Sequence, residues 1–150
     1  RNDGDVKTVA VILYNGTAVG VHTLTDLIEN ESAVFHAHLW DEKYRTIGIG
    51  FYSYIKAAEF FMNKLRLNKI IFKTPKINIG ANRVKEKLEI PCLGETVFES
   101  PVLIAPMQAN LYELDRELLL KIKSRMCELK NNPSWSSRFK FSITLSVSFT

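Results

Sequence analysis

The chain has few cysteines, no long apolar run and no strong excess of charge of either sign. Cys92 and Cys127 stand alone without metal-ligand spacing, which argues against a zinc site or a disulfide framework and indicates free thiols in a reducing cytosol. No apolar run reaches the ~20 residues that a membrane-spanning helix needs. No basic segment followed by an apolar stretch indicates a signal peptide. We therefore expect a cytoplasmic protein with no membrane partner.

The small charge excess also limits the partners. The net charge is +4 over 150 residues and the lysines are scattered, so the sequence favours a solvated basic surface over a nucleic-acid interface. With 46% hydrophobic residues, the chain can form one domain with its own core, and it contains no internal repeat or low-complexity linker. Because residue 1 is Arg rather than Met, we expect a processed, trimmed or partial chain.

The first forty residues predict three antiparallel strands in a meander. Apolar residues alternate within Thr8–Tyr14, and Asn15-Gly16 is a hairpin turn signal because both residues tolerate positive φ. The chain then returns through Thr17–Ile28 and, after a turn at 29–32, forms a third strand at 33–40. The sequence therefore predicts an antiparallel sheet at this end of the chain.

The remaining sequence predicts alternating helices and strands. Apolar residues three or four apart predict amphipathic helices over 47–67 and 78–88, with a buried strand at 67–73 between them. Short strands are expected at 96–98 and 102–105. A third helix is expected over 111–129, where the apolar stripe consists of Leu111, Leu114, Leu118, Ile122 and Met126.

The C-terminal tail predicts a strand with one apolar and one polar face. Apolar residues alternate with Lys, Ser and Thr, so one face of the strand needs a partner. That partner is either the sheet of the same chain or a second subunit, which would give a homodimer through the C-terminal strand. The apolar positions are Phe139, Phe141, Ile143, Leu145, Val147 and Phe149.

The stretch between the third strand and the first helix is the best clue to function. Glycines at such a junction leave backbone N–H groups accessible at the positive end of a helix, where phosphate binds, so we expect a phosphate-bearing cofactor. A Rossmann-type nucleotide site is excluded because three meandering strands precede the glycines. The stretch reads Arg45-Thr46-Ile47-Gly48-Ile49-Gly50.

Two motifs follow one another along the chain: Arg45-x-x-Gly48-x-Gly50, and Asn78-x-x-Ala81-x-x-Val84 followed by Glu86-Lys87-Leu88. Together with the strands before them, they resemble the pyrophosphate loop and the following helix of the GCN5-related N-acetyltransferase (GNAT) family. The resemblance covers roughly residues 9–105. It departs from the family at Lys85, where many members carry a Tyr that is often the general acid, and at Glu89, where they carry Gly.

The resemblance implies an α+β fold with a mixed, mainly antiparallel twisted sheet flanked by helices. We expect one acyl-CoA N-acyltransferase-like domain over residues 1–150, with a core at about 8–105 and a C-terminal helix and strand extension at 106–150. The family's usual N-terminal strand and two helices, which shape the acceptor site, have almost no counterpart before Thr8.

The resemblance further implies transfer of an acetyl or other acyl group from a CoA thioester to a primary amine by direct attack, with acetyl-CoA or another acyl-CoA as donor. Loop N–H groups would hold the pyrophosphate, and the third strand would bind the pantetheine arm and polarise the thioester carbonyl. Asn78 either contacts this arm or caps its helix. The expected cofactor-binding residues are Leu39, Trp40, Arg45, Thr46, Ile47, Gly48, Ile49, Gly50 and Asn78.

Histidines on the third strand are the candidate catalytic residues. His36 is favoured over His38 as general base, because an imidazole with a pKa near 6.5 accepts a proton from an ammonium directly or through water. Both histidines lie on one strand face. The sequence leaves open whether His22 on the neighbouring strand completes a cluster that packs or binds a metal; no metal is expected. Lys85 would assist as an acid if its pKa is lowered.

Two other functions stay open. The short region before Thr8 and the Lys at position 85 favour a non-catalytic module of the same fold that holds acyl-CoA or a protein partner. Mild basicity is the one feature that suggests a nucleic-acid-modifying enzyme of this fold.

Overall fold

Alternating apolar residues build the centre of this molecule. The computed structural model describes residues 8–40, 49–99, 103–131 and 143–149, and it shows a seven-stranded sheet that packs one face into a hydrophobic core. Leu24, Phe35 and Phe72 project from three different strands and pack against the first described helix in one hydrophobic core. Burial of this apolar face is the main favourable contribution to folding.

The described residues form seven strands and three helices. The strands are β1 (Thr8–Tyr14), β2 (Thr17–Ile28), β3 (Ser32–Leu39), β4 (Lys69–Pro75), β5 (Cys92–Phe98), β6 (Met107–Asp115) and β7 (Ile143–Phe149). The helices are α2 (Ile49–Lys64), α3 (Ile79–Lys87) and α4 (Arg116–Asn131). Asn15 and Gly16, both with positive φ, form the β1–β2 turn as the sequence predicts.

The strands lie in the order β5-β6-β4-β3-β2-β1-β7. β3 and β4 are parallel, and every other neighbouring pair in the described sheet is antiparallel. The parallel pair is a consequence of the α2 crossover between the two strands. This mixed, mainly antiparallel sheet with flanking helices confirms the predicted fold class and the N-terminal meander.

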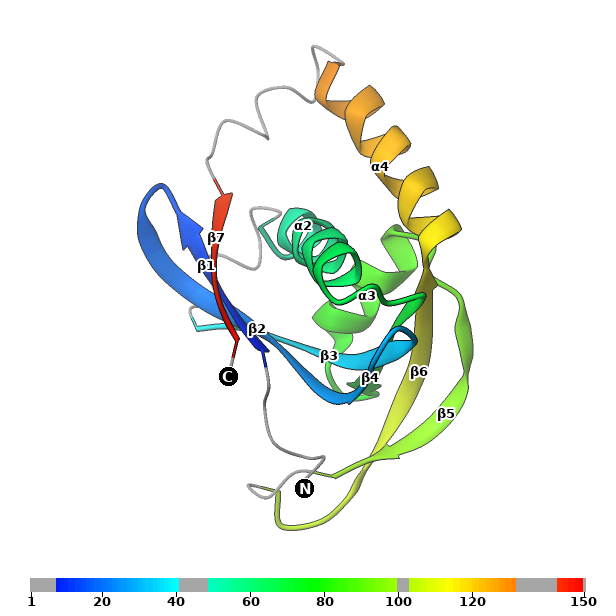
Figure 1. Cartoon of the computed structure of the whole chain (residues 1–150). Coiled ribbons are helices and arrows are strands. Elements are labelled where there is room, and N and C mark those ends of the chain that lie inside the picture. Colours follow the sequence, from blue (N-terminus) through cyan, green and yellow to red (C-terminus); the bar gives the residue numbers. More distant parts are fainter. Residues whose placement is uncertain (1–7, 41–48, 100–102, 132–142, 150) are drawn as a thin grey trace.

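The three described helices lie on the same face of the sheet. Figure 1 shows α2 across that face with α4 beside it. Arg116 donates a hydrogen bond of 2.8 Å to the Met62 carbonyl, and Lys123 forms an ion pair with Glu59, so α4 is tied to α2 at two points. Lys85 of α3 contacts Tyr54 of α2. The helices therefore form one layer over the core. None of them is long and apolar enough to cross a membrane.

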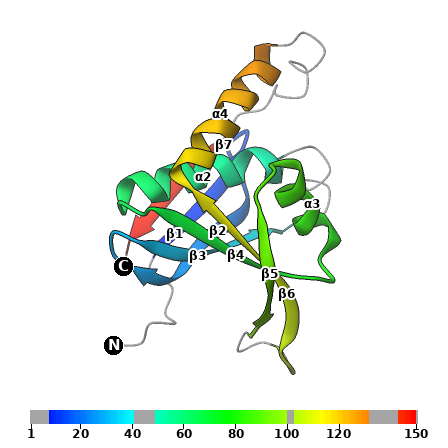
Figure 2. The ribbon, with the colours of Figure 1, turned by 90° about the vertical axis from the view of Figure 1, so that its right-hand side faces the viewer.

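The β5–β6 hairpin extends beyond the rest of the sheet, as Figure 2 shows. Its outer strand β5 is mostly exposed, and Leu93 and Val97 are about half accessible to solvent (57% and 47%). The shift in register between Cys92 and Gly94 coincides with the positive φ of Gly94, which bends the strand there.

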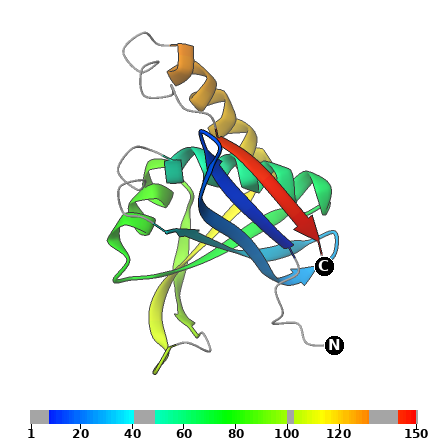
Figure 3. The ribbon, with the colours of Figure 1, turned by 90° about the vertical axis from the view of Figure 1, so that its left-hand side faces the viewer.

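The C-terminal strand β7 pairs with β1 of the same chain. The antiparallel register runs over the full length of β1, from Thr8 opposite Phe149 to Tyr14 opposite Ile143, and Figure 3 shows the two strands side by side. Of the two partners that the alternating tail allows, the structure takes the sheet of the same chain. A homodimer through the C-terminal strand stays a prediction. Phe139 and Phe141 lie outside the described residues.

The helix predicted over 111–129 is wrong in its first part. Residues Met107–Asp115 form β6, an inner strand between β5 and β4, and the helix begins only at Arg116. The Asp115 carboxylate accepts a hydrogen bond of 2.8 Å from the Leu118 N–H, which caps the helix at this point. Leu111 and Leu114 are three residues apart and mimic a helical stripe, but Leu114 is a buried strand residue. The strand expected at 102–105 is not formed at residues 103–105.

This reassignment has a measurable consequence for stability. Leu114 is fully buried on β6, whereas Leu120 on α4 is 64% exposed. We expect Leu114→Ala to lower the free energy of unfolding by about 3 kcal/mol through lost burial and a cavity. Leu120→Ala, the matched control, should change it by less than about 0.5 kcal/mol. Urea denaturation of both variants measures the difference, and similar losses would contradict the assignment.

Candidate functional site

The parallel strands β3 and β4 stay paired over only three residue pairs. Ser32, Ala33 and Val34 are in register with Lys69, Ile70 and Ile71, and the pairing then stops. Both strands continue, β3 to Leu39 and β4 to Pro75. We call residues 35–39 of β3 and 72–75 of β4 the unpaired segment. Peptide groups that point from one strand of this segment towards the other are available to a ligand.

Backbone direction identifies some of these peptide groups. Trp40 donates a 2.9 Å hydrogen bond to the Val19 carbonyl, so its N–H is occupied by β2. In an antiparallel pair, peptide groups of alternate residues point to opposite neighbours. Even-numbered residues of β3 therefore face β2, and Ala37 and Leu39 direct their N–H and C=O groups towards β4. Of the two residues predicted to hold the pantetheine arm, Leu39 directs its peptide N–H and C=O away from β2, whereas the N–H of Trp40 is bonded to β2.

His36 lies on the sheet face opposite the helices. Phe35 packs into the core beneath α2, so the neighbouring side chain of His36 emerges on the other side. Its Nε2 is 2.7 Å from the Thr25 hydroxyl oxygen, and its ring centroid is 6.4 Å from that of Phe98. Continuing the β3–β4 register past the last pair places Lys73 across from His36. These side chains line one side of the unpaired segment.

The surroundings favour a neutral His36. Burial is the largest effect and lowers its pKa below the ordinary value of 6.5; the Asp26 carboxylate raises it and Lys73 lowers it further. An imidazole that is neutral at pH 7 can accept a proton. The role of His36 as general base stays a prediction. His38, two residues along on the same face, is exposed.

His22 does not join the other two histidines. It is paired with Ala37 across β2 and β3, so its side chain lies on the helix face and is buried. Its Nε2 is 3.1 Å from the Ser53 hydroxyl oxygen, and its Nδ1 has no hydrogen-bond partner. Burial, with a smaller contribution from Lys85, lowers its pKa to about 3. The three histidines, which the sequence allowed as a cluster, therefore do not form one, and the described residues contain no group of side chains that could hold a metal ion.

Lys85 on α3 is the residue whose position the sequence could not show. Its side chain is buried at 3% exposure, and its Nζ is 3.4 Å from the Tyr54 hydroxyl. The Nζ also lies over two aromatic rings, 4.6 Å from the centroid of Tyr54 and 5.1 Å from that of Phe72. Phe72 is the first β4 residue past the last β3–β4 pair. Lys85 therefore approaches the unpaired segment from the helix side.

Burial lowers the pKa of Lys85 from 10.5 to about 7. No carboxylate among the described residues forms an ion pair with it. Desolvation without an opposite charge disfavours the ammonium form, and the two aromatic rings compensate in part. A lysine in this state exchanges its proton near neutral pH.

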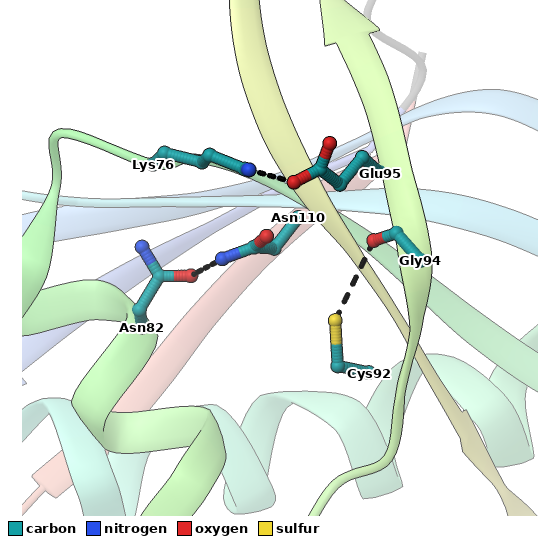
Figure 4. Close-up of polar contacts among 6 residues, drawn as sticks. All are labelled: Lys76, Asn82, Cys92, Gly94, Glu95 and Asn110. Atoms are coloured by element: carbon teal, nitrogen blue, oxygen red, sulfur yellow. Dashed lines mark hydrogen bonds and ion pairs between the residues drawn. The ribbon is translucent and has the colours of Figure 1, made fainter.

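A polar network holds α3 against the sheet. The Asn82 side-chain oxygen accepts hydrogen bonds from the Tyr112 hydroxyl (2.7 Å) and the Asn110 amide (3.0 Å), and the second of these is visible in Figure 4. Burial raises the pKa of Tyr112, so this hydroxyl keeps its proton. Figure 4 also shows the ion pair between Lys76 and Glu95, which connects the start of α3 to β5. Lys85 lies one helical turn after Asn82, so this network also fixes the position of Lys85 relative to the sheet.

Asn78 caps α3. Its side-chain oxygen accepts a hydrogen bond of 3.1 Å from the Ala81 N–H, which is the local role that the sequence allows. Its alternative role at the cofactor arm stays a prediction. Ile49 and Gly50 form the first turn of α2. The other loop residues expected to hold pyrophosphate, Arg45, Thr46, Ile47 and Gly48, lie outside the described residues.

Comparisons with known proteins identify the fold and nothing finer. No family model matches the sequence, and no curated protein matches it. Three kinds of solved acetyltransferase share the fold. A chimera of the Vibrio cholerae spermidine N-acetyltransferase and hSSAT has a TM-score of 0.64 and 15% identity, over 76% of this chain and 70% of that chain. A ribosomal-protein-S5-alanine acetyltransferase from Vibrio fischeri has a TM-score of 0.59 and 14% identity (71% and 63% covered), and a GNAT-family acetyltransferase from Bacillus anthracis has a TM-score of 0.55 and 16% identity (68% and 61% covered).

At these identities the likeness shows the fold, which is that of the GNAT acetyltransferases, as the two sequence motifs predict. The chain spans less than two thirds of the length of several of these proteins, for example 63% of the Vibrio fischeri protein. A second chimera of the spermidine enzyme is also covered over 63% of its length. Activity and substrates are therefore matters for proposal.

The buried amine makes stability depend on pH. The Lys85 pKa is lower in the folded chain than in the unfolded chain, so between about pH 7 and 10.5 unfolding takes up a proton, and stability rises with pH. We expect Lys85→Met to be more stable than wild type at pH 7. The difference in the free energy of unfolding between this variant and wild type should shrink by roughly 1.4 kcal/mol per pH unit above pH 7. Urea denaturation at pH 7, 8 and 9 measures this, with exposed Lys87→Met as control. An advantage that is constant with pH would contradict the burial of an ionisable amine.

Proposed function

We propose that the chain is an acyl-CoA-dependent N-acyltransferase that acts on a primary amine. The observation that carries this proposal is the early end of the β3–β4 pairing after Val34 and Ile71. It leaves peptide groups of two adjacent parallel strands without a strand partner, in a fold shared with acetyltransferases. An extended ligand such as the pantetheine arm of CoA can bind to such groups as an added strand would.

The donor would lie along β3. Peptide groups of Ala37 and Leu39 are directed at the arm, and an N–H aimed at the thioester oxygen would stabilise the negative charge that develops during attack. The pyrophosphate would bind near the start of α2 at Ile49 and Gly50, where the helix dipole is positive. The basic loop residue Arg45 is proposed to contact the same phosphates.

The acceptor amine would approach from the face that carries His36. In the proposed step, the amine nitrogen attacks the thioester carbon, a C–N bond forms and the C–S bond breaks with its electron pair on sulfur. The proton that the amine loses passes to the other ring nitrogen of His36, Nδ1, directly or through one water, because the hydrogen bond to Thr25 occupies Nε2. The hydroxyl of Thr25, 2.7 Å from Nε2, orients the ring.

The acceptor is proposed only as a class. The structural neighbours are named for a polyamine, spermidine, and for the alanine of a ribosomal protein, and both are primary amines. The Asp26 carboxylate and the Lys73 ammonium act on His36 with opposite sign, and the Glu113 carboxylate on β6 is paired with Lys69 on β4. This balance does not favour a polycation over a neutral or anionic amine.

A donor titration tests the proposal directly. We expect acetyl-CoA to bind at micromolar concentration and to raise the melting temperature, because binding to the folded state alone stabilises it. Isothermal calorimetry and thermal unfolding measure both effects, with adenosine as the control that lacks pyrophosphate and pantetheine. Absence of binding would sink the proposal. Binding without thiol release against a panel of primary amines would favour the alternative, a non-catalytic acyl-CoA-binding module.

Turnover should depend on His36. We expect His36→Ala to lower kcat/KM by about 10²-fold, in the range that general base catalysis contributes. Because the lowered pKa keeps the imidazole neutral at pH 7, the wild-type activity should fall only as the pH drops below 6.5, and the variant should lack this decrease. Rates from pH 5 to 8 measure it. His38→Ala should lose less; an equal or larger loss would transfer the role to His38.

A further inference from the structure

His22 and Ser53 are two polar residues in the apolar core between β2 and α2. The His22 side chain is 1% exposed, and Ser53 is fully buried. The rings of Phe35 and Tyr54 pack against the imidazole, with centroids 4.9 and 5.5 Å from its own. Buried polar atoms without a hydrogen bond are costly, and the Nδ1 of His22 has no partner. An apolar pair would fill this space at a lower cost, so packing alone does not explain the two residues.

The hydrogen bonds of His22 and Ser53 run in one direction. His22 Nε2 is 3.1 Å from the Ser53 hydroxyl oxygen, and the Ser53 hydroxyl donates a hydrogen bond of 3.4 Å to the Gly50 carbonyl. Because the single hydroxyl proton goes to Gly50, the hydroxyl oxygen accepts from the imidazole, which places the ring proton on Nε2. Burial lowers the pKa of His22 to about 3, so the ring is neutral at pH 7 and keeps this arrangement.

This chain of hydrogen bonds ends at a peptide group in the first turn of α2. The Gly50 C=O and the Phe51 N–H belong to one planar peptide unit, so an anchored carbonyl also fixes the direction of the N–H. Phe51 is the third residue of α2, and N–H groups in the first turn of a helix have no partner within the helix. This N–H is therefore directed towards the helix N-terminus, where the proposed function places the pyrophosphate of the donor.

Donation to the Gly50 carbonyl has a second effect on the same peptide group. A hydrogen bond accepted by the peptide oxygen polarises the unit, so its N–H becomes a stronger donor. The imidazole and the hydroxyl are both buried, and electrostatic effects are larger there than in water. The helix dipole acts in the same sense at this end of α2. His22 can thus strengthen anion binding at the helix end without touching the ligand.

We propose that His22 and Ser53 are positioning residues for the pyrophosphate of the acyl-CoA donor: they hold the peptide between Gly50 and Phe51 so that its N–H is directed at the phosphate oxygens. The proposal rests on the proposed function and deepens it, because it names side chains that fix the phosphate end of the donor site. Neither residue takes part in proton transfer. Since one comes from β2 and the other from α2, their hydrogen bond also sets the helix end relative to the sheet.

The alternative use of a Ser–His pair, as a nucleophile and its base, does not fit this geometry. The Ser53 hydroxyl donates to the Gly50 carbonyl, so its proton is not directed at the imidazole. Ser53 and His22 are 0% and 1% exposed, and an oxygen buried in this way is not accessible to a substrate carbonyl. The pair therefore acts through the backbone of α2.

The test compares two ligands that differ at the phosphate end. Acetyl-CoA carries the pyrophosphate, whereas S-acetylpantetheine carries the same arm and thioester without phosphate. We expect Ser53→Ala to weaken acetyl-CoA binding about tenfold, the effect of one well-directed hydrogen bond to a charged group, and to leave S-acetylpantetheine binding unchanged. Isothermal calorimetry measures the dissociation constant of acetyl-CoA directly and that of S-acetylpantetheine by competition with acetyl-CoA.

Two further variants separate positioning from a general loss of structure. The double variant His22→Leu, Ser53→Ala removes both buried polar partners, which leaves no unpaired group behind, and it should show the same selective loss. Thermal unfolding checks that it is folded. Ser32→Ala is the matched control, because Ser32 is a buried serine at the start of β3, outside the proposed site. It should leave both dissociation constants unchanged.

The outcomes distinguish this proposal from the proposed function. If acetyl-CoA does not bind wild type, the proposed function fails and the positioning role fails with it. If acetyl-CoA binds wild type and both variants equally tightly, the donor site stands and only the role of His22 and Ser53 is refuted. Equal losses for the two ligands would refute it as well, since the variants would then disturb the whole site.

Discussion

The short pairing between β3 and β4 is the constraint on which the rest of the structure depends. Three residue pairs hold the two parallel strands together at one end, and the remaining peptide groups of both strands face each other without a ladder. The α2 crossover fixes the parallel direction, and the aromatic rings of Phe35 and Phe72 pack on the helix side at the point of divergence. Because buried peptide groups without partners are costly, a fold retains such a feature where a ligand completes the hydrogen bonding.

The two faces of the sheet carry different ionisable groups beside the unpaired segment. On the helix side, Lys85 is surrounded by aromatic rings and its pKa is lowered by burial. On the other side, His36 is partly buried between Thr25 and Phe98 and stays neutral. The same physical effect, desolvation, thus lowers the pKa of both groups, one on each face of the sheet. Neither group is placed by the helices alone, since β3 carries His36 and α3 carries Lys85.

Much of this architecture could be predicted from local pattern. Period-two alternation located β1, β2 and β3, and the Asn15-Gly16 turn signal set their antiparallel order. Asn78 marked the start of α3 because its side chain caps the helix. The pattern failed where the sequence fits both a helical and a strand period. Leu111 and Leu114 have the spacing of a helix, but Tyr112 and Leu114 have the spacing of a strand, and this segment forms β6. The helix begins after Asp115, whose side chain caps it. Strand β6 is stabilised by its neighbours β4 and β5, which local pattern does not include.

The sequence by itself determined the order of most elements, the glycine-bearing junction before α2 and the residue type at each candidate position, because these depend on neighbours along the chain. Only the tertiary structure decided which face each histidine occupies relative to the core, that β7 joins β1, and that Lys85 is desolvated beside Phe72. These properties arise from contacts between residues far apart in sequence. Burial and charge at such contacts set the pKa values that give the site its chemistry, and no local period encodes them.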